Sequence, residues 1–265
     1  MPFESYLITF GILLFIAALV IMLTNRLHIP YAVGLVITGV LLSFVPFIPK
    51  VTLSKELIYG LFLPPLIFEA ALYIHWKNLR NDYPIILILA TLCVILAASI
   101  TTFGMHFIGK WSWASAAIFG TLIAATDPVA VMAAIKETKI KGRFLFLLEA
   151  ESLFNDGTAA ILFGIVISMV LGETVSGLDV TLMFLKTVFG GILCGAVVAV
   201  LALGLAGRTK DHLIEITFTT IAAYGSFLLA EHFQFSGVLA TLTAGLMVGN
   251  IGPLGSISEK GREAV

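Results

Sequence analysis

Nine long apolar runs dominate the sequence and leave little of the chain for any other structure. A helix that crosses a bilayer needs about 17–25 apolar residues. Backbone polar groups must be paired inside lipid, so runs of this length predict helices rather than strands. The sequence therefore predicts an all-α, polytopic membrane bundle, one transmembrane domain over residues 1–265. Its spans are expected at about 6–23, 29–48, 57–74, 83–108, 111–135, 144–171, 180–206, 214–230 and 235–251.

The composition excludes a water-soluble protein. Hydrophobic residues make up 59% of the chain and charged residues 12%, about half the charged fraction of a soluble domain. The net charge of -1 provides no basic surface for nucleic acid, and two cysteines cannot form a disulfide scaffold or a cysteine-rich metal site. The sequence contains no phosphate loop, dinucleotide fingerprint or HExxH motif, so we expect neither an enzyme nor a cofactor.

The basic residues predict how the chain is oriented. Eleven of them fall in the first, third, fifth and seventh connections and the C-terminal tail, and three fall in the opposite connections. Short basic loops stay in the cytoplasm. We therefore expect a multi-pass protein of the plasma membrane with its N-terminus outside and its C-terminus in the cytoplasm.

Five carboxylates lie inside the predicted spans, namely Glu69, Asp127, Glu149, Glu151 and Asp156. A charged group within the hydrocarbon is costly and is therefore a functional candidate. By helical rise, Asp127 lies about 13 Å and Asp156 about 18 Å from the cytoplasmic ends of their runs. Two neighbouring antiparallel helices would thus bring two carboxylates to a similar depth near the membrane midplane.

The tripeptide Thr126-Asp127-Pro128 predicts a broken helix. Proline lacks an N–H and disfavours the α conformation of the preceding residue. Asp127 would then cap a second half-helix that starts at Pro128, and the carbonyl of Thr126 would lose its helical partner. Such a break in mid-membrane is tolerated where it lines a cavity or an ion site. The alternative is a structural kink in which Asp127 is satisfied by its own cap.

The next run carries polar residues at helical spacing. Ser152 and Asp156 are four residues apart and share a face. With the carbonyl of Thr126, their oxygens would suit a small monovalent cation. Glu151 and Asn155 form a neighbouring stripe, and the alternative for Ser152 and Asn155 is a polar seam between helices. Desolvation disfavours the ionised form of a midplane carboxylate, so a cation and a proton can compete for one site.

Two further patterns concern packing and bending. Pro64 and Pro65 would bend the third span one turn before Glu69, which could face the same cavity or reach toward the interface. The GxxxG motifs at 191–195 and 245–249 predict close helix contacts, either within one chain or between subunits.

The motifs around Asp127 and Asp156, read with residues 63–69, resemble the monovalent cation:proton antiporter-1 family, the NhaP-type sodium/proton antiporters. The resemblance implies that sodium, lithium or potassium is exchanged for protons by alternating access. It implies that Asp156 carries both cation and proton, and that Asp127, Ser152 and the backbone of Thr126 complete the site.

The same resemblance assigns supporting roles. Asn155 would support the site and Glu69 would lie at or beside it. Electrogenic relatives have aspartate at the Asn155 position, so asparagine implies electroneutral exchange. The resemblance also implies a homodimer whose subunits contain an inverted repeat of about twelve or thirteen helices. In such a subunit, a buried arginine would pair with the glutamate at the Glu151 position. With nine spans and no deep basic residue, we expect a C-terminally incomplete antiporter.

Three other functions compete with this interpretation. An inactive, truncated antiporter remnant would keep the site without transport. An intramembrane aspartyl protease could use Asp127 and Asp156 as a dyad, but both contexts lack the GxGD pattern. A cation channel would need a pore that is wet from both sides.

Overall fold

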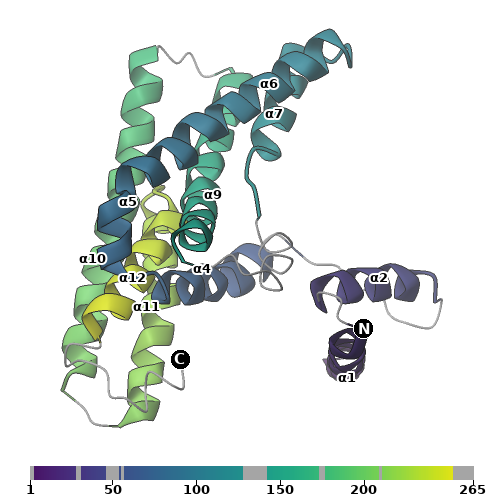
Figure 1. Ribbon diagram of the computed structural model, residues 1–265, viewed down its shortest axis with the longest axis vertical. Helices are drawn as coiled ribbons and strands as arrows, with labels where there is room; N and C mark the ends of the chain where they lie inside the picture. Colours follow the sequence, from purple (N-terminus) through teal and green to yellow (C-terminus); the bar gives the residue numbers. More distant parts are fainter. Residues whose placement is uncertain are drawn as a thin grey trace. The chain divides into compact units, whose positions relative to one another are not determined.

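The computed structural model describes residues 3–27, 31–45, 54, 57–127, 142–172, 177–208 and 211–252. All regular structure in these ranges is helical, which confirms the predicted all-α fold (Figure 1). In chain order the helices are α1 (Phe3–Leu27), α2 (Tyr31–Ser43), η1 (Ile58–Phe62), α4 (Leu63–Leu72), α5 (Trp76–Ile88), η2 (Leu89–Cys93), α6 (Val94–Phe107), α7 (Trp113–Leu122), α9 (Arg143–Val170), α10 (Gly177–Ala206), α11 (His212–His232) and α12 (Gly237–Ile251).

Five helical segments in the described ranges are long and apolar enough to cross a membrane. They are Ile8–Leu27, Trp76–Phe107, Arg143–Val170, Leu178–Ala206 and Leu213–His232. Four shorter apolar helices are Val33–Ser43, Ile58–Leu72, Trp113–Leu122 and Gly237–Ile251. Each of the nine predicted runs overlaps one of these nine segments, in order. Since four of the segments are shorter than a bilayer requires, the number of spans stays a prediction.

The chain divides into two compact units. The first comprises residues 1–54 and 129–138, and its described part is the pair α1 and α2. Thr24 is buried in this pair, and its hydroxyl donates to the carbonyl of Val20 on its own helix at 2.9 Å. The second unit comprises residues 55–128 and 139–265 and contains all the other helices.

Within the second unit, α4, α10, α11 and α12 pack against one another, and we call them the α12 bundle. Close approach of these helices depends on the two GxxxG motifs. Gly191 and Gly195 face α12, whereas Gly245 and Gly249 face α4. A Cβ atom at Gly245 would lie 2.7 Å from the carbonyl oxygen of Phe68, so a larger residue would separate the helices. The motifs therefore make contacts within one chain.

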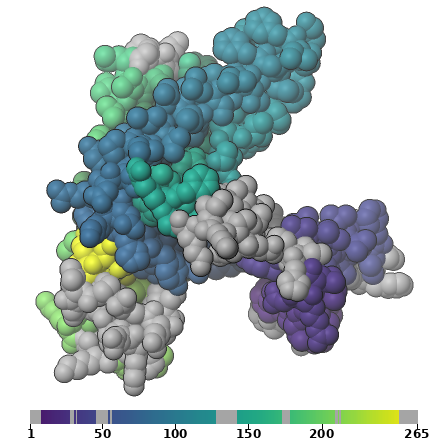
Figure 2. Space-filling model, in the orientation of Figure 1, coloured from purple at the N-terminus to yellow at the C-terminus, as the bar shows by residue number. Residues whose placement is uncertain are grey.

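Five other helices of the second unit, α5, η2, α6, α7 and α9, form the α9 bundle, whereas η1 leads directly into α4. Helices α5 and α6 continue through the π turn η2, and in the space-filling view this blue segment lies against the teal-green α9 (Figure 2). Small residues allow the helices to pack closely, with Ala98, Ala124 and Ala159 buried together. Helix α9 also contacts α10, α12 and α4, so it lies at the seam between the two bundles.

Candidate functional site

The predicted helix break begins earlier than its sequence pattern indicates. Helix α7 ends at Leu122, and residues 124–127 are not helical. The chain thus reaches Asp127 in a non-helical conformation. The expected cap at Asp127 and a second half-helix from Pro128 lie outside the described residues, because the description stops at 127 and resumes at 142.

Two side chains of α9 bind the backbone at this break. The hydroxyl of Ser152 donates to the carbonyl oxygen of Thr126 at 3.0 Å. The Nδ2 of Asn155 donates to the Thr126 hydroxyl oxygen at 2.7 Å and to the Thr126 carbonyl at 3.4 Å. Three residues expected at the site are therefore brought together, and the interrupted chain is attached to α9.

Glu151 and Asn155 form the second stripe that the sequence predicts. Asn155 is fully buried, and its Nδ2 also donates to Oε1 of Glu151 at 2.8 Å. The carbonyl and the carboxylate that surround Nδ2 accept hydrogen bonds and cannot donate them, which fixes the orientation of the amide. Its Oδ1 accepts no hydrogen bond from any described residue. A buried oxygen acceptor therefore remains beside Thr126.

The carboxylates of Asp127 and Asp156 approach the same region. Asp156 is exposed and lies one turn after Ser152 on α9. Asp127 and Glu151 lie close enough to Asp156 for their charges to act on it. Like charges in one place repel each other, and a cation or a proton would relieve that repulsion. Among the described residues, no group of three or more His, Cys, Asp or Glu side chains is placed to hold a metal ion, so a cation site here stays a prediction.

Glu69 lies apart from these residues in the contacts that the structure describes. It is exposed on α4, in the α12 bundle, where its neighbours Ile67 and Phe68 are buried. In the described ranges it forms no hydrogen bond with Thr126 or Asp156. Its place at or beside the ion site stays a prediction.

An ion pair between α5 and α9 was not anticipated from the sequence. Arg143, the first residue of α9, donates from Nε and Nη2 to Oδ1 of Asp82 at 3.0 and 2.6 Å. The side chain of Asp82 is 11% exposed and that of Arg143 is 65% exposed. The N-cap residue Gly142 offers no side-chain hydrogen bond, and a basic residue opposes the helix dipole at this end. Asp82 therefore compensates the positive charge at the start of α9, the helix that carries Asp156.

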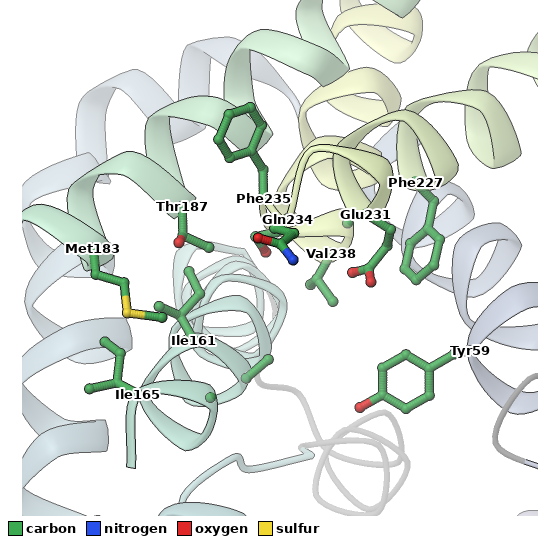
Figure 3. Close-up of a pocket in the computed structure, with 14 residues that line it drawn as sticks. Tyr59, Ile161, Ile165, Met183, Thr187, Phe227, Glu231, Gln234, Phe235 and Val238 are labelled. Carbon is green, nitrogen blue, oxygen red and sulfur yellow. The ribbon is translucent and has the colours of Figure 1, made fainter. Parts of the chain in front are cut away.

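A cavity of about 260 Å³ lies at the seam between the bundles. Figure 3 shows Glu231, at the end of α11, and Tyr59 of η1 on one side of it, with Ile161 of α9 and Met183 of α10 on the other. Ala160 also lines the cavity, one turn beyond Asp156 on the same helix. Glu231 is not among the predicted site residues, because it falls just past the apolar run 214–230. The cavity therefore runs along α9 and begins one turn beyond Asp156.

The apolar helices of spanning length define a multi-pass membrane protein, and its polar cluster lies where the chain leaves α7 and meets α9. Residues 12–265 match the sodium/hydrogen exchanger family, transmembrane region, and the chain belongs to that family.

Several curated relatives are similar in sequence to this chain. The chain is 39% identical over 251 residues to the Na(+)/H(+) antiporter ApNhaP of Aphanothece halophytica, covering 94% of this chain and 48% of the relative. It is 38% identical over 250 residues to the low-affinity Na(+)/H(+) antiporter NhaS1 of Synechocystis sp., with 94% and 47% covered. The chain thus spans about half the length of these relatives. Both relatives are named as Na(+)/H(+) antiporters.

Proposed function

We propose that this chain binds a monovalent cation, sodium first and lithium or potassium as alternatives, and exchanges it for protons across the membrane. The single observation that carries the proposal is the attachment of Thr126 to Ser152 and Asn155. This attachment joins a non-helical segment to the polar face of α9 that bears Asp156. The antiporter names of the relatives support the same function.

The ligands of the cation would all be hard oxygens. We assign the carboxylates of Asp127 and Asp156, the hydroxyl of Ser152 and the carbonyl of Thr126. The hydrogen bond from Ser152 to Thr126 brings two of these oxygens to 3.0 Å from each other. A bound cation would turn the Ser152 hydroxyl, since its oxygen can accept a cation while its hydrogen points elsewhere. Asn155 would hold the carbonyl in place as the hydroxyl turns.

Exchange would follow from competition between the cation and a proton at Asp156. The nearby charges of Asp127 and Glu151 make an empty, fully ionised cluster unfavourable. Either a cation or a proton neutralises part of that charge, so the site is expected to be occupied by one or the other when it changes access. This requirement links the movement of the two ions.

We propose that access alternates by movement of the α9 bundle relative to the α12 bundle. The cation ligands lie in the α9 bundle, whereas the cavity lies between α9 and the other bundle. A shift along this seam would open or close the cavity without taking the ligands apart. In this scheme α9 carries proposed cation ligands on one part of its surface and lines the cavity with another.

The exchange is expected to be electroneutral, because Asn155 stands where electrogenic members of the family have an aspartate and adds no titratable group next to Asp156. Asn155→Asp would add one, and the exchange rate should then depend on membrane potential. Rates measured at imposed potentials in proteoliposomes test this expectation. A wild-type rate that already follows the potential would contradict it.

We also propose that the protein resides in the plasma membrane with its N-terminus outside, as the distribution of basic residues predicts. A homodimer is the assembly expected from the family resemblance. Labelling of single cysteines from either side of intact cells, together with the mass of the detergent-solubilised protein, tests both statements.

The experiment that tests the function is sodium-dependent proton movement in inside-out vesicles that carry this chain, with Asp156→Asn as the paired control. Sodium should alkalinise an acidified lumen, and the variant should give no signal. A separate measurement of sodium-dependent thermal stabilisation reports binding without transport. Equal signals from the wild type and the variant in both assays would overturn the site.

A further inference from the structure

The chain passes from the α12 bundle to the α9 bundle at a sharp corner. Helix α4 ends at Leu72 and α5 begins at Trp76, with Tyr73, Ile74 and His75 between them. His75 is extended, with φ -79° and ψ 123°, and its side chain forms no capping hydrogen bond. Helix ends leave carbonyl and N–H groups without helical partners. Nδ1 of His75 lies 3.1 Å from the carbonyl oxygen of Tyr73, and a residue of α12 supplies further partners at this corner.

Asn250, one residue before the end of α12, supplies them on both sides of the corner. Its Nδ2 donates to the carbonyl of Ile74 at 2.8 Å, and its Oδ1 accepts from the N–H of Trp76 at 2.7 Å. Nδ2 also donates to the carbonyl of Leu246 on its own helix at 2.8 Å. These three partners fix the orientation of the amide, because exchanging O and N would break all three bonds.

The position of Asn250 follows from the close contact of α12 with α4. A Cβ atom at Gly249 would collide with the carbonyl of Leu72, and Gly245 is in similar contact with Phe68. The absence of side chains at these two positions lets α12 run along α4 to its end. Asn250 then reaches past the last turn of α4 to the first N–H of α5. One side chain of the α12 bundle thus binds the end of its own bundle and the start of the other.

We propose that Asn250 is a positioning residue for transport, which fixes the joint between the two bundles while the ion site moves. This inference rests on the proposed function. If the α9 bundle moves relative to the α12 bundle, unrestrained backbone torsions at residues 73–76 would absorb part of the displacement. The amide of Asn250 restricts those torsions, so that displacement of one bundle is transmitted to α5.

The test compares Asn250→Leu with wild type. Leucine has a similar size and removes the bonds to Ile74 and Trp76. One net hydrogen bond corresponds to about a fivefold change in an equilibrium constant, so the maximal rate of sodium/proton exchange should fall by at least about fivefold. The sodium KM should stay within about twofold, because no cation ligand lies at the corner. Hydrogen exchange of a peptide covering residues 73–79 should become faster.

Two further variants make the result specific. Asn250→Asp keeps the acceptor for the Trp76 N–H but sets a carboxylate oxygen against the carbonyls of Ile74 and Leu246, so its maximal rate should fall at least as far as that of Asn250→Leu. Thr243→Val is the matched control, since the Thr243 hydroxyl donates only within α12, to the carbonyl of Leu239 at 2.7 Å. The control should keep both the rate and the exchange pattern.

The outcomes separate this inference from the proposed function. A wild-type protein without sodium/proton exchange would contradict the proposed function. Hydrogen exchange of residues 73–79 would still test whether Asn250 restricts the corner. An unchanged labelling pattern in Asn250→Leu would overturn the role of Asn250. So would an unchanged maximal rate, or a sodium KM that rises while the maximal rate stays at the wild-type value.

Discussion

The chemistry of the site depends on the difference between a carboxylate and a neutral oxygen. Asp156→Asn should abolish exchange, because an amide cannot alternate between a proton and a cation, and Asp127→Asn should do the same. Ser152→Ala should be milder, with a sodium KM raised about fivefold, since one neutral ligand is lost. Initial rates of exchange at several sodium concentrations measure these effects.

The matched control for the Ser152 variant is Ser99→Ala. The Ser99 hydroxyl donates within α6, to the carbonyl of Ile95 at 2.7 Å, and not to Thr126. Its removal should leave the sodium KM unchanged. Wild-type exchange in either aspartate variant, or equal effects of Ser152→Ala and Ser99→Ala, would contradict the assigned ligands.

The ion pair of Asp82 and Arg143 should respond unequally to removal of its two partners. Arg143→Met leaves the buried carboxylate of Asp82 without a partner, whereas Asp82→Asn leaves a largely exposed arginine in water. An unpaired buried charge is the more costly of the two. Thermal unfolding should show a lower midpoint for Arg143→Met than for Asp82→Asn, and the double variant should recover part of the loss. Equal midpoints for the two single variants would show that burial of Asp82 has no energetic consequence.

Local patterns account for the part of the site that could be predicted. The proline after Asp127 and the spacing of Ser152, Asn155 and Asp156 act within one or two helical turns, and the structure brings Thr126 to the first two of these. The pair of Asp82 and Arg143 joins residues 61 positions apart, and no local pattern indicates it. The contacts of Glu69 could not be predicted either, because its position on a helix does not indicate which neighbouring helix its side chain contacts.

At the scale of elements, hydropathy predicts where helices lie better than where they end. The run expected at 83–108 belongs to a helix that starts at Trp76, because its first turns are polar and do not raise the hydropathy. The run expected at 111–135 is helical from Trp113 to Leu122 in the described part. The π turns η1 and η2 were not predicted, because hydropathy does not distinguish them from α-helix.

The proline pair of the third span removes a helical hydrogen bond, and a residue of another helix replaces it. Pro65 has no N–H to donate to the carbonyl of Leu61 four residues earlier. The hydroxyl of Tyr224 on α11 donates to that carbonyl instead, at 2.9 Å. Tyr224→Phe should therefore lower stability by about 1 kcal/mol.

Thermal unfolding of the purified protein in detergent measures this loss. Tyr83→Phe is the control, because Tyr83 is exposed on α5 and forms no hydrogen bond with its hydroxyl in the described part of the chain. A Tyr224→Phe variant as stable as Tyr83→Phe would mean that the Leu61 carbonyl needs no partner from α11.

For the second unit as a whole, the important property is that the α9 bundle and the α12 bundle meet at α9 with a cavity between them. Sequence patterns predict the helices of each bundle but not this grouping, which arises from the glycine contacts of α12 and the alanine contacts of α9. If transport requires the two bundles to shift along their seam, then filling the cavity should stop transport without removing any cation ligand.

Gly164 provides the position for that test. It lines the cavity on α9, and a Cβ atom there would meet nothing within 4 Å. Gly164→Trp should fold, because the side chain has space, and should lower the maximal exchange rate by at least about tenfold, since closure would then overpack the seam. Sodium-dependent thermal stabilisation should persist, because the ligands are untouched. Gly204→Trp on α10 is the control, as Gly204 also has open space around it and does not line the cavity. If Gly164→Trp transports as fast as Gly204→Trp, the cavity stays open throughout the cycle and the seam is not where access changes.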